Sequence, residues 1–466
     1  MLLQHRRAFS MSSFVKPRPG MWIAMGLAVA LAGYGAAGQS RIPAKPAATA
    51  QGYAPTSMCR GCHDRIVEQH LKSSHEMSFT NQTFQAQYQR DLLPKAQKDP
   101  GLSREARECI ACHEPITYAT KGPLIVAPEA VNPAMNGVTC DVCHTMTGYR
   151  GARPQNGNYI MAPTDIKLGP FKEESDWHHA YSELQTKSEI CAVCHEAVNH
   201  HGFQIKSTFT EWQESTFAQQ GVECQDCHMN VDGFLTAGKP RFSSGKAASM
   251  TLGSAPDRAR LYTHEFPGAH SKTQVEGAIE LTIEATPADA SQRGMMAINV
   301  TIDNSRTGHS MPSGSADLRL LWLEVSARIG DSLEALPASP EERGTTTNPG
   351  SYSVAGYGNS DALLIGPEIP KGSRVYRAIF ADSEGQVTLN SYDAVAKLFD
   401  NRLKAAEKRK ESYRLLVPET VKGDISINAT LKYLPYSSTF SDRLRLPRPE
   451  AVIVAQREFR LNPEGR

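Results

Sequence analysis

The sequence predicts an α+β multidomain protein in which a loop-rich, mainly helical region over residues 54–275 precedes an antiparallel β-sandwich over residues 276–466. Two observations lead to this division. All ten cysteines lie between Cys59 and Cys227, together with most of the histidines. From about Glu276 the pattern changes, because segments that alternate or carry β-branched residues recur between Gly, Pro, Asn and Asp.

The first residues of the chain predict export. Four basic residues precede an uncharged, mostly apolar run from Met21 to Gly38 that ends in small residues: Arg6, Arg7, Lys16 and Arg18. Residues 1–38 are therefore expected to be a signal peptide or an N-terminal membrane anchor, since the run is about as long as a short membrane span. Residues 39–53, rich in Ala, Pro, Gly and Gln, are expected to be a linker. Both alternatives predict a periplasmic or cell-surface, extracellular location for the rest of the chain.

Composition excludes some function classes. The 466 residues carry a formal net charge of +1, so the basic excess typical of nucleic-acid binding is missing. With 40% hydrophobic and 21% charged residues the chain is globular. Residues 54–275 nevertheless have too few aliphatic runs for a conventional core of their size. Something other than side chains must fill their interior.

The β-sandwich prediction depends on seven segments with strand character. They are Glu280–Ala285, Met295–Asp303, Leu318–Arg328, Arg374–Ala381, Tyr413–Val417, Asp424–Tyr433 and Ala451–Phe459. Residues 329–373 form a long insertion rich in Gly, Pro, Ser and Thr. We expect Tyr392–Leu398 to be a short helix and the charged residues 400–411 to be a solvated face.

All ten cysteines fall into five C-x-x-C-H motifs. They are Cys59/Cys62/His63, Cys109/Cys112/His113, Cys140/Cys143/His144, Cys191/Cys194/His195 and Cys224/Cys227/His228. Residues i, i+3 and i+4 share one face of a helical turn. Two thiols can therefore reach the two vinyl groups of one haem while the adjacent imidazole ligates its iron. This spacing is the attachment signature of c-type haem, and it predicts five covalently bound haem c groups.

Disulfides, zinc sites and thioredoxin-like sites are the alternatives for C-x-x-C pairs. Histidine makes up only 15 of 466 residues, so its presence after every one of the five pairs is not accidental. Zinc sites would combine the pairs in twos, and five is an odd number. The haem interpretation also supplies the missing core, because the macrocycles would fill it.

Each iron needs a second axial ligand from elsewhere in the chain, because the porphyrin shields its far face from the motif. Nine histidines are available for five places: His70, His75, His178, His179, His200, His201, His264, His270 and His309. Bis-histidine ligation of all five haems is therefore feasible, and it generally gives low potentials. His70 follows His63 too closely to bind the same haem.

Several sequence elements resemble the superfamily of the tetrahaem cytochrome of ammonia oxidisers and hydroxylamine oxidoreductase. They are Cys59-Arg-Gly-Cys-His63 with Ser74-His75-Glu76, Gly137-Val-Thr-Cys-Asp-Val-Cys-His144, Gly169-Pro-Phe-Lys with His179-Ala-Tyr-Ser182, Gly221-Val-Glu-Cys-Gln-Asp-Cys-His228-Met229 and Gly308-His309-Ser-Met-Pro312-Ser-Gly314. This sequence carries five motifs where the ammonia-oxidiser protein has four, so the haem arrangement cannot be transferred whole.

The resemblance implies which histidines are distal ligands. It favours His75, His179, His264 and His309, with His270 or one of His200 and His201 in the fifth place. Of the neighbours His178 and His179, only one is expected to face a haem. The last matching element, around His309, resembles the turn that starts the C-terminal β-domain of these proteins.

These observations favour an electron-transfer protein over a catalyst, in respiratory or extracellular electron transfer. Closely packed haems form a wire, and the protein sets their potentials. Expected partners are redox proteins, including other multihaem cytochromes or further copies of this chain. One alternative is a redox enzyme that acts on a small nitrogen or sulfur oxyanion at a haem with an open distal site. A second alternative is a structural subunit of a haem filament.

Overall fold

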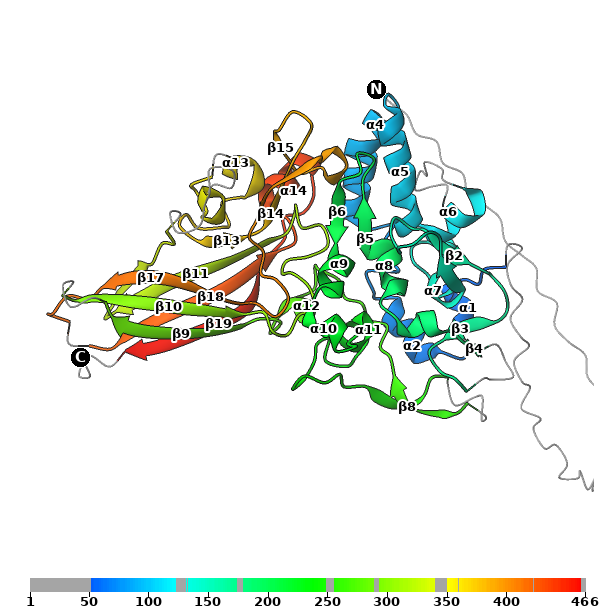
Figure 1. Ribbon diagram of the computed structural model, residues 1–466, viewed down its shortest axis with the longest axis horizontal. Helices are drawn as coiled ribbons and strands as arrows, with labels where there is room; N and C mark the ends of the chain where they lie inside the picture. The colour runs from blue at the N-terminus through cyan, green and yellow to red at the C-terminus, as the bar shows by residue number, and fades with distance from the viewer. Residues whose placement is uncertain are drawn as a thin grey trace, which may run out of the picture. The chain divides into compact units, whose positions relative to one another are not determined.

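The computed structural model describes residues 52–122, 131, 133–173, 179–248, 255–288, 293–339, 350–358, 360–421 and 423–461 (Figure 1). The expected signal peptide or anchor, nearly all of the expected linker, and His178 lie outside these residues. The described residues all belong to one compact unit. None of the described helices is both long enough and apolar enough to cross a bilayer.

Short helices dominate the cysteine-rich region, residues 54–275. The helices are α1 Thr56–Cys59, α2 Asp64–His70, α3 Gln82–Gln85, the π-helix η1 Ala86–Leu92, α4 Leu93–Ala96, α5 Pro100–His113, α6 Pro115–Lys121, η3 Pro133–Met135, α7 Cys140–His144, η4 Glu183–Thr186, α8 Glu189–His195, α9 Thr208–Gln213, α10 Thr216–Gln219, α11 Cys224–His228 and α12 Lys272–Val275.

Four of the five motifs end a helix, because α5, α7, α8 and α11 each finish on the motif histidine. The longest, α5, starts where the Asp99 carboxylate accepts hydrogen bonds from the N–H groups of Gly101 and Leu102, with Pro100 at its first position. In the first motif α1 ends at Cys59 and α2 begins just after His63. The helical turn expected from the C-x-x-C-H spacing is confirmed for these four motifs, whereas the first motif forms a turn in which the N–H groups of Cys62 and His63 both donate to the Cys59 oxygen.

Short strand pairs connect these helices. They are β1 Met146–Tyr149 with β2 Tyr159–Met161, β3 Lys167–Gly169 with β4 His179–Tyr181, β5 Glu196–Val198 with β6 Gln204–Ser207, and β7 Ser243–Lys246 with β8 Asp257–Leu261. All are antiparallel except β3 and β4. The apolar side chains of the region gather in two small clusters, one around Ile110 and Tyr88 and one around Val142 and Met146.

The β-rich region, residues 276–466, contains antiparallel sheets. One has the order β17-β10-β9, with β9 Glu280–Pro287, β10 Met295–Asp303 and β17 Lys408–Leu416. The other has the order β12-β11-β18-β19, with β13 also pairing β11. Its strands are β11 Leu320–Ile329, β12 Ser332–Ala335, β13 Arg374–Tyr376, β18 Ile425–Leu434 and β19 Val452–Leu461.

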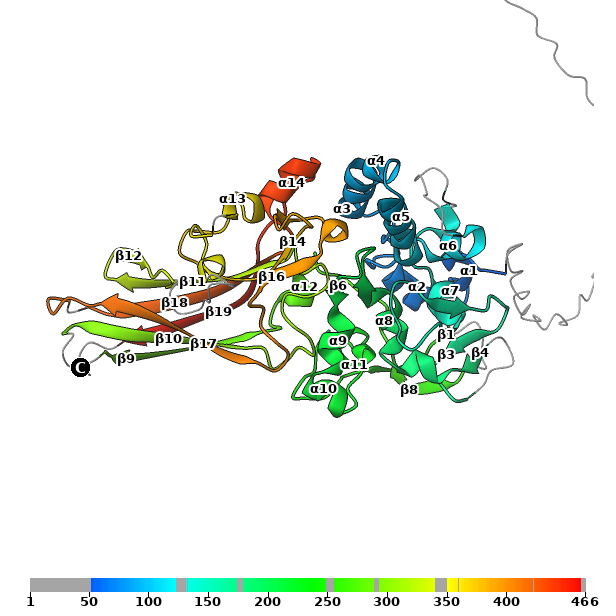
Figure 2. The same cartoon turned by 45° about the horizontal axis from the view of Figure 1, so that its top comes forward.

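These two sheets share one hydrophobic cluster, and both views show their strands beside one another (Figure 2). Ile298 and Val300 of β10 and Leu323 and Ile427 of the other sheet belong to this cluster. Buried and less buried residues alternate along β10 and β18, as expected of strands with one face on a core. The chain is therefore of the α+β class, as predicted.

Two predictions were wrong in the part of the chain that forms a smaller, third sheet. Tyr392–Leu398 is not a helix: only η6 Ser391–Asp393 is helical, and β16 Ala396–Asp400 follows it. The single strand expected at Arg374–Ala381 is divided into β13 and β14 Ala378–Ala381, which belong to different sheets. The break falls at Arg377, whose buried guanidinium binds Asp361 at 2.9 Å. The order of the smaller sheet is β15-β14-β16, with β15 at Val387–Thr388.

The charged residues 400–411 are not a uniformly solvated face, which corrects a third prediction. Arg402 and Glu411 are buried. Glu411 binds Arg374 at 3.0 Å and accepts a hydrogen bond from the Tyr376 hydroxyl. Because a buried charge must be paired, this segment supplies ion pairs to the interior rather than charge to the solvent. Among the described residues of the region, the helical segments are η5 Gly350–Ser353, α13 Asp361–Leu364, η6 and α14 Ser438–Leu444.

Candidate haem-binding centre

Three motif histidines have one ring nitrogen fixed by a backbone carbonyl. The Nδ1 atom of His63 lies 2.9 Å from the Ala247 oxygen, that of His113 lies 2.7 Å from Ser78, and that of His144 lies 2.6 Å from Leu168. A metal-binding histidine usually donates its second N–H in this way, which selects the tautomer whose other nitrogen is free for the metal. These contacts favour Nε2 as the iron ligand.

Three motif histidines, of which only His144 belongs to the previous set, each face a second imidazole. The ring centres are 6.2 Å apart for His75 and His195, 6.3 Å for His144 and His264, and 6.2 Å for His228 and His309. A metal–imidazole bond is about 2 Å long and the ring centre lies about 1 Å beyond the nitrogen, so two rings on opposite sides of one ion have centres about 6 Å apart. The three pairs therefore fit an iron between them.

The non-motif partners are oriented by their own backbone. The Nδ1 atom of His264 lies 3.1 Å from the Tyr262 oxygen, and that of His309 lies 3.0 Å from the Ser310 oxygen. Phe266 packs between two of the pairs, with its ring centre 4.5 Å from that of His75 and 6.1 Å from that of His264. The backbone contacts of His264 and His309 thus favour the same tautomer as at the motif histidines, with Nε2 available to the iron.

Four of the six paired rings have a pKa well below the physiological pH range. Burial lowers the pKa of His75 and His264 to about 3, and it lowers the pKa of His195 and His228 to about 4. Because a metal binds the unprotonated imidazole, burial keeps these side chains in the form that can act as a ligand.

The other predicted ligands are placed differently. His179 directs Nε2 to the Phe171 oxygen at 2.7 Å, and its ring lies over Gly169. The ring of His270 packs against Tyr436 with a centre separation of 5.7 Å. The ring centres of His200 and His201 are 3.9 Å apart, and His200 Nδ1 lies 3.4 Å from Glu105 Oε2. Among the described residues, none of these four is brought opposite a motif histidine.

Thiols of different motifs approach one another, and all ten are free. The thiol of Cys59 lies beside that of Cys140, close enough for each to shift the pKa of the other, and the same holds for Cys112 with Cys194 and for Cys191 with Cys224. Burial raises the pKa of Cys143, and a thiolate at Cys143 would in turn raise the pKa values of Cys191 and Cys194. The first motif is therefore adjacent to the third, and the fourth is adjacent to the second, third and fifth.

His113 has a different neighbourhood. The Phe84 ring stacks on it with a centre separation of 3.8 Å and an interplanar angle of 8°. Within the described part of the chain, no second imidazole lies across from His113 at about 6 Å, the separation that a shared metal ion requires. The pKa of His113 is lowered to about 3 by burial and by the positive charge of Lys206.

Asp317 is a buried carboxyl close to Lys206, and no composition or motif signal singled it out. Its Oδ1 atom is buried without a hydrogen-bond partner in the described structure. Burial raises the pKa of Asp317 to about 6, while the charges of Arg319 and Lys206 act in the opposite direction. An acid with a raised pKa is protonated in the folded state at pH values where the unfolded chain has already ionised.

The Asp317→Asn substitution is therefore expected to stabilise the protein at pH 8 and to have little effect at pH 4. Between pH 3.8 and about 6 the unfolded chain ionises this carboxyl while the folded state keeps it protonated. The free energy of unfolding therefore falls over this range, by on the order of 2–3 kcal/mol. Thermal unfolding at both pH values measures this difference. An equal change in melting temperature at pH 4 and pH 8 would contradict it.

Comparison with known proteins agrees with this geometry. Residues 58–145, which hold the first three motifs, match the family model of cytochrome c554 and c-prime. The fold is similar to the crystal structure of a penta-heme cytochrome c552 from Thermochromatium tepidum, with a TM-score of 0.57 and 19% identity over 88% of this chain and 99% of that chain. No curated protein matches the chain.

The fold, the motifs and these matches define a multihaem c-type cytochrome with covalently attached haem c groups. Within this class, the chain resembles cytochrome c554 and c-prime over residues 58–145 and penta-heme cytochrome c552 in its overall fold. The predicted resemblance is thereby confirmed. The residues present fit the haem group, because half-buried thiols and imidazole pairs with the spacing of an iron site lie together.

Proposed function

We propose that the protein is an exported pentahaem cytochrome that transfers electrons through closely packed haems. The observation that carries the proposal is the set of three imidazole pairs at the separation of an iron site. The proximity of the motif thiols supports it, since the first motif adjoins the third and the fourth adjoins the second, third and fifth. All five motifs thus join in one branched network, with the fourth motif at the branch point. When bound, each haem supplies a one-electron couple.

The residues of the chain have distinct roles in this proposal. The ten motif cysteines hold the haems, and the five motif histidines are the proximal ligands. His195, His144 and His228 receive His75, His264 and His309 as distal ligands, at the ring separations given above. Histidine on both sides of an iron favours a low potential, which suits electron transfer in respiration.

The β-rich region has a supporting role in the proposal. Its two large sheets would form the β-sandwich expected from the sequence and would cover the haem of the fifth motif, to which the loop after β10 contributes His309. The proposed location is the periplasm or the cell surface. The proposed partners are redox proteins, including other multihaem cytochromes or further copies of this chain.

The intact mass of the purified holoprotein, together with partial photoreduction, tests this function. We expect five haem additions, and we expect one injected electron per protein to redistribute among the haems before any second electron arrives. A mass with fewer additions would contradict the haem number. Haems that keep their injected electrons without exchange would contradict the proposed network, whatever their number.

A second candidate function, catalysis on a small nitrogen or sulfur oxyanion, is favoured by one observation. His113 faces Phe84, and no second imidazole lies across from it in the described structure. The charge of Lys206 acts on both His113 and the buried Asp317 carboxyl. Carbon monoxide or nitrite binding to one of the reduced haems, lost when that haem is removed by replacing Cys109 and Cys112 with alanine, would support catalysis. Five low-spin haems that bind neither ligand would exclude it.

A further inference from the structure

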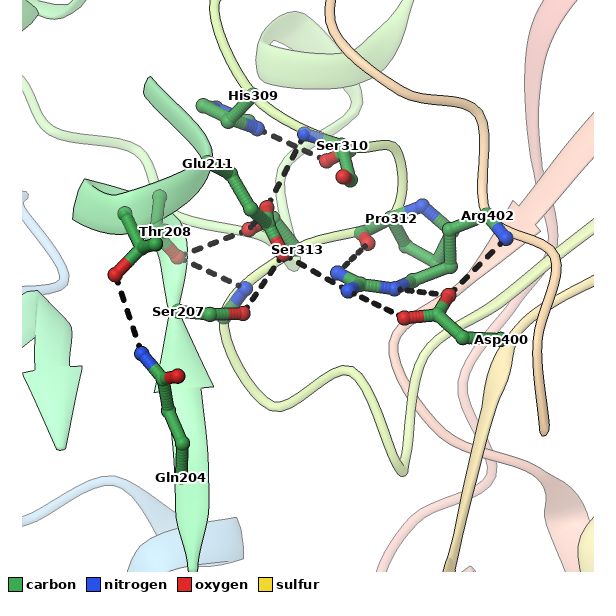
Figure 3. Close-up of polar contacts among 12 residues, drawn as sticks. Gln204, Ser207, Thr208, Glu211, His309, Ser310, Pro312, Ser313, Asp400 and Arg402 are labelled. Carbon is green, nitrogen blue, oxygen red and sulfur yellow. Dashed lines mark hydrogen bonds and ion pairs between the residues drawn. The ribbon is translucent and has the colours of Figure 1, made fainter. Parts of the chain in front are cut away.

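The loop that carries His309 is fixed by a buried ion pair between two distant segments (Figure 3). The Glu211 side chain, on α9 of the cysteine-rich region, and the Arg402 side chain, after β16 of the β-rich region, are 13% and 5% exposed. Glu211 Oε1 lies 2.8 Å from an Arg402 Nη2 atom. The two residues are far apart in sequence, so this contact joins the two regions.

Glu211 contacts the residue next to His309 directly. Its Oε2 atom accepts a hydrogen bond from the Ser310 N–H at 3.1 Å and another from the Ser313 hydroxyl at 3.0 Å. The Ser310 carbonyl oxygen in turn lies 3.0 Å from His309 Nδ1. The carboxylate therefore fixes one peptide group of the loop, and the next peptide group fixes the imidazole.

Arg402 holds the other side of the same loop. Its Nη1 atom donates to the Pro312 oxygen at 3.1 Å, and Asp400 binds its Nε and Nη2 atoms, both at 2.9 Å. The backbone of the next residue, Leu403, pairs with Met311 in both directions at 2.8 and 3.0 Å. Since Asp400 already compensates the guanidinium, loss of Glu211 would not leave Arg402 as an unpaired buried charge.

Helix α9 belongs to the segment that leads to the fifth motif, through α10 and into α11, which ends at His228. The clamp of Glu211 and Arg402 thus connects the segment that supplies His228 with the loop that supplies His309. These two imidazoles are nearly parallel, with an interplanar angle of 7°. An axial ligand on a loop needs such support, because a second hydrogen-bonded shell orients the ligands of metal sites.

We propose that Glu211 and Arg402 are positioning residues that hold His309 against the iron of the fifth-motif haem. The proposal rests on the assignment of His309 as the distal ligand of that haem, and it adds the device that keeps the ligand in place. Opening of the loop would expose the distal face of this haem alone.

Four variants of the holoprotein test the clamp: His309→Ala, Glu211→Ala, Glu211→Gln and the control Glu324→Gln. Glutamine keeps an oxygen acceptor for the Ser310 N–H but cannot pair with the Arg402 charge. Glu324 is a matched control, because it also binds a cation, Lys432 at 2.9 Å, and lies on β11 within the β-rich region. The readouts are the high-spin ferric EPR signal, carbon monoxide bound per protein, and the melting temperature.

We expect His309→Ala to bind carbon monoxide at one more haem than the unmodified protein does. Glu211→Ala is expected to raise the open fraction of the same haem roughly tenfold or more, the effect of losing charge-assisted hydrogen bonds. Glu211→Gln should give a smaller increase and Glu324→Gln none. Added imidazole should restore the low-spin signal in His309→Ala and Glu211→Ala.

The outcomes separate this proposal from the ligand assignment on which it rests. If His309→Ala leaves spin state and carbon monoxide binding unchanged, the ligand assignment fails and the clamp fails with it. If His309→Ala opens the haem but Glu211→Ala only lowers the melting temperature, the ligand assignment stands and the clamp is overturned. Should Glu211→Ala not fold, the ordering of Glu211→Gln above Glu324→Gln decides the question in the same way.

Discussion

Replacement of both Cys191 and Cys194 by alanine is expected to remove one haem and to interrupt electron exchange among the remaining four. The fourth motif is the junction of the network, because its thiols approach Cys112, Cys143 and Cys224 of three other motifs. Without its haem, the second and fifth motifs lose their described contacts with the rest. After partial photoreduction the remaining haems should equilibrate in separate groups, which time-resolved absorption measures.

The control for this prediction removes a haem from the end of the network. Cys59→Ala combined with Cys62→Ala should also lower the intact mass by one haem, but the first motif adjoins only the third through the described thiol contacts. Its four remaining haems should still equilibrate as one group. Identical kinetics in the two double variants would show that the fourth motif is not the junction.

Substitution of His264 or His75 by alanine is expected to convert one low-spin haem to a high-spin form that binds carbon monoxide. Each imidazole lies opposite a motif histidine at the distance that an iron requires, His264 opposite His144 and His75 opposite His195. Removal of either ring opens one axial position. Absorption and EPR spectra of the holoprotein count the haems that change.

His270→Ala is the matched control, because sequence reasoning also named this residue as a ligand. The structure places its ring against Tyr436, so its loss should leave all haem spectra unchanged. If His270→Ala produced a high-spin haem while His264→Ala did not, the pairing proposed from ring geometry would be wrong.

Sequence reasoning identified the strands of the β-rich region well, because one buried face imposes a period of two on the residues. Met295–Asp303 was predicted with the bounds of β10 itself. Prediction from the sequence failed where a buried charge interrupts the alternation of apolar and polar residues. Arg377 divides the expected strand into β13 and β14, and its partner Asp361 lies in a segment that was assigned to an insertion. Such ion pairs join residues whose charges, taken alone, indicate solvent exposure.

The same contrast applies to the candidate site: some of its features are marked by short sequence motifs, and others depend on contacts between residues far apart in the chain. The haem motifs are local, since five residues on one helical turn contain all the chemistry of attachment. The clamp of Glu211 and Arg402 is not local, and nothing in either segment marks it. The charged residues 400–411 were expected to be solvated, yet Arg402 is buried through contacts with residues far away in the chain.

The distances along the chain between the paired imidazoles bear on how the protein matures. His195 follows His75 by 120 residues (195 − 75), His264 follows His144 by 120 (264 − 144), and His309 follows His228 by 81 (309 − 228). Closure of such long loops costs chain entropy and comes after local helix formation. Thioether attachment at a freshly exported motif would therefore precede completion of its axial coordination. The newly made protein would pass through a stage in which several irons are still accessible to outside ligands, and this stage ends only when the C-terminal half has folded.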